Sequence, residues 1–333
     1  MLKIAAVVLN WNQSQLTRDC VATLRKSERL CDRIIVVDNG SRPEQLAILT
    51  DVRTATDVTY LPLRANRGFA GGMNAGIREA ARLGADYVWL VNNDAFPEPN
   101  CLTRLLAVME ADTSLACVTP RLLGTDGVEQ PSGGRFINTQ GRNEFLSSSD
   151  LQFPVGRGGY WVVGTIPLFR ATALQIANRF DENYFAYWEE VDLCLRLGRL
   201  GFCFRSVPEV RALHIGQVSS GDSAFGFYLY VRNWLRLLRK HCHPSVRSFK
   251  TVQFIRQILD NAGCFELHGQ HAKAQAAIEA ILATLSGEVG KPRWFGSAPR
   301  LASFLAKHPW QFVKVINFLL RFIGPKPTKG VSA

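Results

Sequence analysis

Residues 4–12 have the sequence IAAVVLNWN, in which six consecutive apolar residues run directly into a polar Asn-Trp-Asn. A similar change from apolar to polar residues recurs at 33–41, RIIVVDNGS, and at 87–94, YVWLVNND. Runs that are apolar at every position, and not at alternate ones, are typical of strands buried on both faces of a parallel sheet. Three segments with helical spacing lie between these runs, at 16–26, 43–50 and 70–83. One further strand is expected at 58–62. The sequence therefore predicts an α/β fold with a mostly parallel sheet flanked by helices.

Polar side chains follow three of the expected strands. Asn10 and Asn12 follow the first strand, Asp38 the second, and Asn93 with Asp94 the fourth. Ligands of open α/β sheets bind beyond the carboxyl ends of the strands, so these side chains are expected to face one crevice. The carboxylate of Asp38 could accept a hydrogen bond from a nucleobase N–H or a ribose hydroxyl. The alternative is that Asp-Asn-Gly-Ser simply forms a turn.

Residues 66–76, NRGFAGGMNAG, form a glycine-rich start of a helix. Glycines allow a ligand to approach the backbone closely, and a helix N-terminus favours the negative charge of a diphosphate. The spacing matches neither GxGxxG directly after the first strand nor GxxxxGK[ST], which argues against a dinucleotide-dependent oxidoreductase and a P-loop enzyme. A structural turn that lets the helix pack closely is the alternative.

Two residues are candidate metal ligands. Asp94 at a strand end could hold Mg²⁺ or Mn²⁺ through oxygen, with the phosphates of a substrate completing the coordination. A turn that ends the strand is the alternative, because one aspartate makes a poor metal site. His214 closes the short apolar run 210–213 and would complement Asp94.

Glu189, Glu190 and Asp192 place three carboxylates within four residues, directly after Trp188 and other aromatic residues. Adjacent carboxylates with apolar neighbours raise one another's pKa, which suits a general base. The alternative is an acidic first turn of a helix, stabilised by the helix dipole. Both can hold together.

Charge is distributed unevenly along the 333 residues, whose net charge is +11. Residues 211–333 contain 17 Lys and Arg against 5 Asp and Glu, which leaves 22 against 23 in residues 1–210. We therefore expect a near-neutral domain at 1–222, which contains the candidate site residues, and a basic, helical C-terminal region at 223–333. Such a region suits an anionic partner.

Two segments of the C-terminal region, 227–241 and 310–324, have the pattern of basic amphipathic helices, with Arg232 on the polar face of the first. Helices of this kind can lie in a membrane interface. Packing on the catalytic domain or a homodimer contact is the alternative. The aromatic residues fall on the apolar faces and not among the charges, so nucleic acid is not expected as a partner.

Taken together, the stretches 8–12, 37–41, 66–76, 92–95 and 185–196, with His214, resemble the family 2 glycosyltransferases, especially the bacterial rhamnosyltransferase-like branch. The resemblance covers about residues 1–220 and implies a GT-A fold, a Rossmann-like nucleotide-binding half joined to an acceptor-binding half. The donor-binding residues it implies are Asn10, Asn12, Asp38, Asn66, Arg67, Gly68, Phe69, Asn74 and Asn93. The others are Asp94 and His214 for a metal, Glu190 or Glu189 for catalysis, and Gly164, Thr165, Trp188 and Asp192 on the acceptor side.

The resemblance implies an inverting glycosyltransferase that moves a sugar, with rhamnose favoured, from a dTDP- or UDP-sugar. The acceptor would be a saccharide, lipid-diphosphate-linked, in the synthesis of a cell-surface polysaccharide such as lipopolysaccharide. A carboxylate would take the proton of the acceptor hydroxyl, while Mg²⁺ or Mn²⁺ and the helix N-terminus stabilise the departing diphosphate. Inversion is expected because only one carboxylate cluster is placed for attack. The enzyme would be cytoplasmic and peripheral on the inner face of the plasma membrane.

Two departures from the family pattern leave alternatives open. Asn92 stands where the family's DxD motif has its first aspartate, and Glu190 stands where the family has the aspartate of a Glu-Asp pair. The base is therefore assigned to Glu190 or Glu189. A non-catalytic nucleotide-sugar-binding module with a degenerate metal site is the alternative function.

Overall fold

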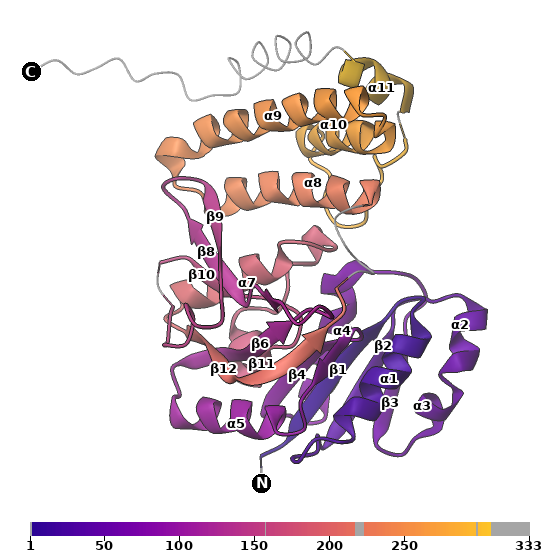
Figure 1. Cartoon of the computed structure of the whole chain (residues 1–333), viewed down its shortest axis with the longest axis vertical. Coiled ribbons are helices and arrows are strands. Elements are labelled where there is room, and N and C mark those ends of the chain that lie inside the picture. Colours follow the sequence, from indigo (N-terminus) through magenta and orange to yellow (C-terminus); the bar gives the residue numbers. More distant parts are fainter. Residues whose placement is uncertain (1, 157, 217–222, 298, 308–333) are drawn as a thin grey trace, which may run out of the picture. The chain divides into compact units, whose positions relative to one another are not determined.

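A computed structural model describes residues 2–156, 158–216, 223–297 and 299–307 (Figure 1). The strands are β1 (Ile4–Asn10), β2 (Arg33–Asp38), β3 (Val58–Pro62), β4 (Tyr87–Asn92), β5 (Ala95–Pro97), β6 (Leu115–Leu123), β7 (Glu129–Gln130), β8 (Gly133–Ile137), β9 (Arg142–Leu146), β10 (Tyr160–Val162), β11 (Leu168–Arg170) and β12 (Cys203–His214). The helices are α1 (Ser14–Leu24), α2 (Pro43–Ile48), α3 (Thr50–Thr54), α4 (Gly68–Arg82), α5 (Cys101–Ala111), α6 (Ala171–Ile176), the 3₁₀ helix η1 (Glu182–Tyr184), α7 (Glu189–Arg199), α8 (Ala224–His241), α9 (Pro244–Leu267), α10 (His271–Leu285) and α11 (Pro299–Lys307).

The described residues form two compact units. The α/β unit comprises residues up to 138, 142–216 and 289–291, and the helical unit comprises 139–141, 223–288 and 292–307. The expected border between 222 and 223 adjoins residues outside the description, and it stays a prediction.

A mixed sheet of nine strands forms the α/β unit, in the order β3-β2-β1-β4-β11-β6-β12-β5, with β7 paired to β6. Strands β3, β2, β1 and β4 are parallel, and β6 pairs in parallel with β12. Strand β11 runs antiparallel between β4 and β6, and β5 runs antiparallel to β12. The predicted α/β class, with a mostly parallel sheet, flanking helices and C-terminal helices, is confirmed.

The first strand shows why uninterrupted apolar runs form this sheet. Ile4 and Val8 point into the main core with α1, whereas Val7 points to the opposite face, toward α4. Helix α4 lies so close to β1 that a Cβ at Gly76 would be 2.2 Å from a methyl carbon of Val7. Both faces are therefore buried, and each fully buried Val or Leu contributes roughly 1.5–3 kcal/mol to stability.

The middle of the chain contains a second, smaller sheet. Strands β8, β9 and β10 form a separate antiparallel sheet, in which β8 and β9 make a hairpin. Strands β10 and β11 belong to different sheets. Strand β12 has an irregular register against β6 between Val207 and Arg211.

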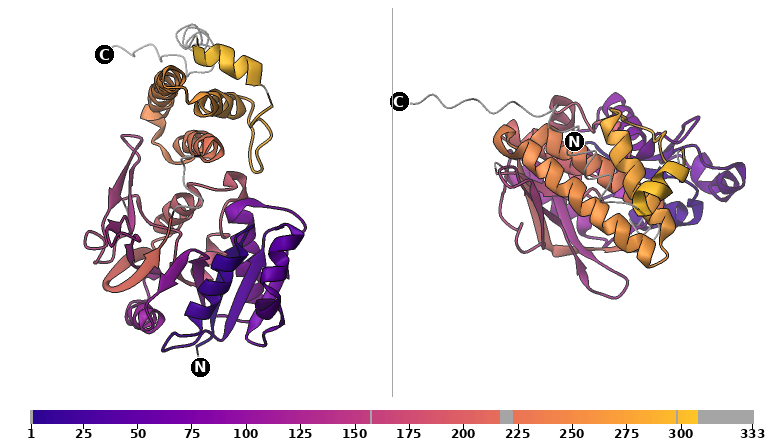
Figure 2. Two further views of the ribbon diagram at one scale, coloured as in Figure 1. Left: turned by 45° about the vertical axis from the view of Figure 1, so that its right-hand side comes forward. Right: turned by 90° about the horizontal axis from the view of Figure 1, so that it is seen from above.

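Helix α10 of the helical unit packs against α8, α9 and α11, and these helices lie side by side in Figure 2. The prediction that Arg232 lies on the polar face of α8 is wrong. Arg232 is 2% exposed, and its guanidinium donates to Glu288 at 2.9 Å, where Tyr228 also donates at 2.6 Å. The predicted helix at 310–324 lies outside the described residues. Within the described ranges, no helix combines the length and the apolar composition needed to span a membrane.

Candidate active site

A buried hydrogen-bond network joins the carboxyl ends of β1, β2 and β4. Asn10 donates to Oδ1 of Asp38 at 2.9 Å and to the hydroxyl of Ser41 at 3.2 Å. Thr17 donates to the amide oxygen of Asn10 at 2.8 Å and accepts from Asn93 at 3.1 Å. Asn10 is fully buried and Asp38 is 2% exposed, so Asn10 supports Asp38 from within the protein. The three strand ends thus meet, as expected from the sheet.

The turn after β1 is fixed by Asn12, whose φ of 55° lies in the left-handed region that asparagine tolerates. Its backbone N–H donates to the hydroxyl of Ser41 at 2.9 Å, and its side-chain oxygen accepts from the N–H of Arg42 at 2.9 Å. Trp11 is left 50% exposed beside Asn12. No role was predicted for Trp11 from the sequence, although an aromatic residue at a strand end is a usable signal for a stacking surface.

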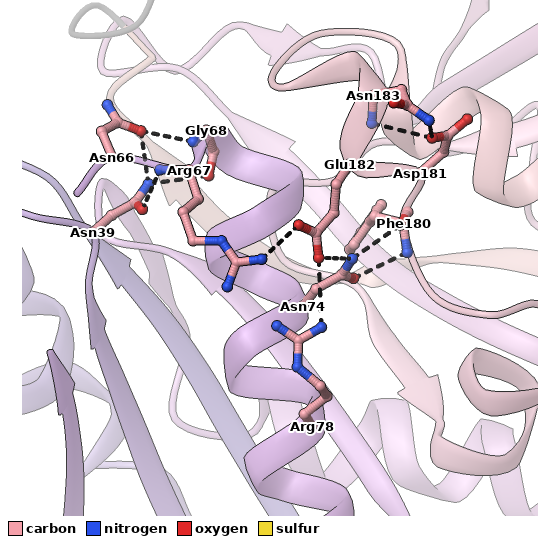
Figure 3. Close-up of polar contacts among 10 residues, drawn as sticks. All are labelled: Asn39, Asn66, Arg67, Gly68, Asn74, Arg78, Phe180, Asp181, Glu182 and Asn183. Carbon is pink, nitrogen blue, oxygen red and sulfur yellow. Dashed lines mark hydrogen bonds and ion pairs between the residues drawn. The ribbon is translucent and has the colours of Figure 1, made fainter. Parts of the chain in front are cut away.

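The glycine-rich segment is held by Asn39, at the end of β2 (Figure 3). The side-chain nitrogen of Asn39 donates to Asn66 at 3.1 Å and to the carbonyl of Gly68 at 3.0 Å. Its oxygen accepts from the N–H of Arg67 at 2.9 Å, while Asn66 accepts from the N–H of Gly68 at 2.7 Å. The half-buried Phe69 follows and packs its ring edge-on against Phe180. The first turn of α4 is therefore tied to the carboxyl end of β2.

Asn74, an expected donor-binding residue, contacts the segment that leads to α7. Its side chain clasps the backbone of Phe180, donating to the carbonyl at 2.9 Å and accepting from the N–H at 3.0 Å. It also donates to the carboxylate of Glu182 at 3.1 Å, which Arg67 contacts at 2.8 Å (Figure 3). Glu182 was missed by the sequence analysis, since its partners lie more than 100 residues away along the chain.

The two candidate metal ligands are brought together by the pairing of β12 with β5, in which His214 lies opposite Ala95. Nε2 of His214 is 3.5 Å from Oδ1 of Asp94, and Nδ1 is 2.7 Å from the amide oxygen of Gln130. Two bonds of about 2.1 Å to one cation can span the first distance. The amide oxygen of Asn92 is buried and has no hydrogen-bond partner among the described residues.

These residues fit a divalent cation only in part. Carboxylate, imidazole and amide oxygen are suitable donors. In the described part of the chain, however, no group of three or more His, Cys, Asp and Glu side chains converges. A cation held here would need ligands from a bound substrate.

Helix α7 begins at Glu189 after a strained segment. Phe185, Tyr187 and Trp188 have φ values of 67°, 71° and 71°, in the left-handed region that non-glycine residues rarely adopt. Each such residue costs of order 1–3 kcal/mol, and surrounding structure must hold it there. Strain of this kind, directly before the candidate base, is typical of a functional site.

The carboxylates of Glu189 and Glu190 are poorly solvated. Glu189 is buried and Glu190 partly exposed, and each has one buried carboxylate oxygen with no hydrogen-bond partner among the described residues. Burial raises the pKa of Glu189 well above its ordinary range, and the charge of Glu190 raises it further. Burial also raises the pKa of Glu190, although backbone groups at the start of α7 oppose this. The pair therefore binds protons more tightly than ordinary glutamates, as the sequence analysis expected.

The acceptor-side candidates divide into two groups. A Cβ at Gly164 would lie 3.5 Å from Cβ of Glu190 and 3.8 Å from the ring of Phe69, so Gly164 lies beside both residues. The carbonyl of the buried Thr165 accepts from the N–H of Asn92 at 2.8 Å and ties this segment to β4.

Asp192 and Trp188, the other two acceptor-side candidates, are both buried. Asp192 is fully buried and pairs with Arg196, one turn later on α7, at 2.8 Å. Arg196 in turn donates to the carbonyl of Arg179 at 2.6 Å, so this ion pair anchors α7. Trp188 is 5% exposed and precedes the helix in a left-handed conformation.

The mixed sheet, the joined strand ends and the carboxylate pair at the start of α7 define a glycosyltransferase of the GT-A class. The sequence model of the family described as Glycosyl transferase family 2 matches residues 5–175, about half of the chain. The chain belongs to this family. It is an enzyme that transfers a sugar in glycan synthesis, and the predicted likeness to the bacterial rhamnosyltransferase branch is confirmed.

Two relatives and one solved structure illustrate the similarity. Galactofuranosyltransferase GlfT1 of Mycobacterium tuberculosis is 31% identical over 218 residues, covering 63% of this chain and 69% of that protein. N-acetylglucosaminyl-diphospho-decaprenol L-rhamnosyltransferase of the same organism is 28% identical over 218 residues, covering 56% and 68%. GalNAc-T7, solved with UDP, GalNAc and Mn²⁺, matches with a TM-score of 0.56 at 14% identity, covering 72% of this chain and 48% of that one. The last likeness shows the fold alone.

Proposed function

We propose that this enzyme is an inverting glycosyltransferase that moves a sugar, with rhamnose favoured, from a dTDP- or UDP-sugar to a saccharide acceptor. The observation that carries the proposal is the position of Glu190. Glu190 is a partly exposed residue beside Gly164, and Gly164 also lies beside Phe69 of the glycine-rich segment. A base at this point can serve an acceptor hydroxyl and lie close to a donor at the same time.

In the proposed reaction Glu190 removes the proton of the acceptor hydroxyl as that oxygen attacks the anomeric carbon from the side opposite the nucleotide. A positioned base of this kind contributes about 10²–10⁴-fold to the rate. Burial raises the pKa of Glu190, and the charge of Glu190 adds to the effect of burial in raising the pKa of the deeper Glu189. One attack by one oxygen inverts the anomeric configuration.

Donor binding is assigned to the joined strand ends and the start of α4. Asp38 receives the nucleoside, with Trp11 as an additional stacking surface, and the segment Asn66–Phe69 lines the sugar-diphosphate site. Asp94 and His214 would hold Mg²⁺ or Mn²⁺, which when bound stabilises the negative charge of the departing diphosphate. The Mn²⁺ and UDP in the GalNAc-T7 structure are consistent with this assignment.

For the acceptor we favour a lipid-diphosphate-linked saccharide in cell-surface polysaccharide synthesis. The name of the mycobacterial rhamnosyltransferase, which specifies a decaprenol-linked diphosphate, supports this choice. An acceptor of this kind would hold the enzyme at the inner face of the plasma membrane. A homodimer remains an alternative role for the helices of the C-terminal region.

We assign the contact with the membrane to a groove in the helical unit. A groove of about 1010 Å³ runs along α8, α9 and α10, and its lining includes Arg239, Arg247, Arg256 and one acidic residue, Asp260. Phe249 also lines this groove and is 66% exposed. Excess positive charge beside an exposed aromatic side chain suits the headgroups of anionic phospholipids.

The test is a panel of nucleotide sugars assayed for transfer and for release of the nucleotide, with Mg²⁺ or Mn²⁺, with and without lipid extract as the acceptor source. We expect one donor to react, and Glu190→Gln to lose at least about 100-fold in rate while still binding it. Glu209→Gln on β12, an exposed glutamate, is the matched control and should keep wild-type rates. Binding without turnover, even with lipid extract, would instead support the non-catalytic module, for which Asn92 is the motivating residue.

A further inference from the structure

Three side chains from the start and the middle of α4 converge on one carboxylate, that of Glu182 in η1 (Figure 3). Arg67 contacts one carboxylate oxygen at 2.8 Å, and Asn74 and Arg78 contact the other at 3.1 and 3.5 Å. Burial acts to raise the pKa of Glu182, but the contacts with Asn74, Arg67 and Arg78 together outweigh burial and lower that pKa. Glu182 is therefore an ionised anchor between α4 and the segment that leads to α7.

The segment that Glu182 anchors is the strained one. Other contacts also hold it against α4, among them the clasp of Asn74 on the backbone of Phe180 and a hydrogen bond of 3.1 Å from the N–H of Ala70 to the carbonyl of Phe185. Glu182 lies between these two attachment points. Left-handed residues persist only where neighbouring structure holds them, and Glu182 supplies the charged part of that support.

We propose that Glu182 is a positioning residue that fixes the segment 180–188 against the donor-binding end of α4, and thereby sets the place of Glu190 relative to the donor sugar. The inference rests on the proposed function for its catalytic consequence. Arg67 belongs to the donor-binding segment, so the same guanidinium that adjoins the donor also holds the segment carrying the base. The side chains of Arg67 and Glu182 are 46% and 37% exposed, and ion pairs so exposed add little to stability.

Because the pair of Arg67 and Glu182 adds little to stability, a variant that breaks it can lose the positioning of the segment without unfolding. Glu182→Gln keeps the size of the side chain, and its amide oxygen can still accept from Asn74. Its NH₂ group, however, would face the guanidinium of Arg67, donor against donor. The variant should therefore stay folded while the segment 180–188 loses its register with α4.

The experiment compares wild type with Glu182→Gln and with Glu79→Gln, which breaks the pair of Glu79 with Arg82 on the same helix. We expect kcat to fall at least about tenfold in Glu182→Gln, because small misplacements of a reacting group are costly, with donor KM changed less than about threefold. The acid limb of the pH profile should stay in place, because Glu190 still titrates. Glu79→Gln should match wild type in kcat, in donor KM and in the acid limb of the pH profile.

A second measurement does not depend on turnover. Hydrogen exchange of the amides at 180–188, without donor, should be about tenfold faster in Glu182→Gln and unchanged in Glu79→Gln. Unchanged exchange would overturn the inference even if the enzyme works as proposed. Faster exchange would support the anchor even if no sugar donor were found. A raised donor KM with unchanged kcat, or a shifted acid limb, would mean that Glu182 binds donor or titrates in the reaction, and would also overturn it.

Discussion

Nε2 of His214 faces Oδ1 of Asp94 at 3.5 Å, while Nδ1 of the same ring lies 2.7 Å from the amide oxygen of Gln130. The amide of Gln130 is oriented by its nitrogen, which donates to the carbonyl of His214 at 3.3 Å. Since an amide oxygen can only accept, we assign the ring proton to Nδ1. In the neutral ring, Nε2 then turns a lone pair toward a carboxylate, an arrangement that a shared cation would stabilise.

Gln130→Ala tests that arrangement without removing a ligand. Loss of the acceptor for Nδ1–H frees the ring to rotate, and such changes typically reduce metal affinity by about 10–100-fold. We expect this loss in Mn²⁺ titrations of transferase activity and in calorimetry with nucleoside diphosphate present. His243→Ala, at an exposed histidine of the helical unit, is the control and should leave Mn²⁺ dependence unchanged. Equal Mn²⁺ affinity in Gln130→Ala and wild type would argue against a cation at His214.

The carboxylates that open α7 should make activity and stability respond to pH in opposite directions. Burial raises the pKa of both glutamates in the folded state, whereas an unfolded glutamate has a pKa of about 4.3. Their contribution to stability is therefore complete below about pH 4.3 and is lost as pH rises through the raised folded-state pKa values. The base must be ionised, so the rate rises over the same range.

Glu189→Gln makes this prediction measurable. A neutral side chain at 189 removes the cost of burying charge, so the melting temperature of the variant relative to wild type should increase from pH 5 to pH 8. A gain of 1 kcal/mol corresponds to about 2–4 °C for a unit of this size. Thermal unfolding across pH, with Glu209→Gln as the control, is the measurement. If the difference in melting temperature between Glu189→Gln and wild type stayed constant with pH, the pKa of Glu189 would not be raised in the folded state.

The sequence predicted the sheet well because its signals are local. Runs such as 4–9 and 87–91 are apolar at every position, so their composition alone predicts strands that are buried on both faces. The polar residues that follow parallel strands then gather at one edge of the sheet. The contacts of Asn74, Asp192 and Arg232 were not predicted, because the tertiary fold determines which groups lie beside these side chains. Asn74 meets Phe180, more than 100 residues away, and Arg232 meets Glu288. Spacing along a helix cannot show whether a charged residue faces solvent or such a partner.

Neutralising the groove of the helical unit should weaken binding to anionic vesicles. Basic residues near an anionic surface contribute about 1 kcal/mol each, so the triple change of Arg239, Arg247 and Arg256 to Gln should cost about 100-fold in affinity. The measurement is cosedimentation with vesicles containing phosphatidylserine, compared with phosphatidylcholine alone.

The control for that experiment changes three paired arginines of the α/β unit, Arg18, Arg25 and Arg42, to Gln, with the same loss of net charge. This control should bind vesicles almost as wild type does, and added salt should weaken both. If the two triple variants lose affinity equally, then general charge and not the groove attracts the protein to lipid.

Gly68 offers a test of how closely the donor and catalytic segments must fit. Its φ is +74°, and a Cβ there would lie 2.2 Å from the carbonyl oxygen of Phe185 and 2.6 Å from its ring. Gly68→Ala therefore adds both backbone strain and a clash with the residue that begins the strained segment before α7. Gly127, with a φ of +77° and nothing within 4 Å of its would-be Cβ, isolates the strain alone.

We expect Gly127→Ala to cost about 1–2 kcal/mol of stability, the usual penalty for a side chain in the left-handed region, with normal activity. Gly68→Ala should cost more and should also reduce kcat at least about tenfold, because Phe185 must move and the start of α7 moves with it. Denaturant unfolding and steady-state kinetics of the two variants measure these effects. If Gly68→Ala lost no more activity than Gly127→Ala, the contact between α4 and Phe185 would be irrelevant to catalysis, and Glu190 would have to be positioned by the packing of α7 alone.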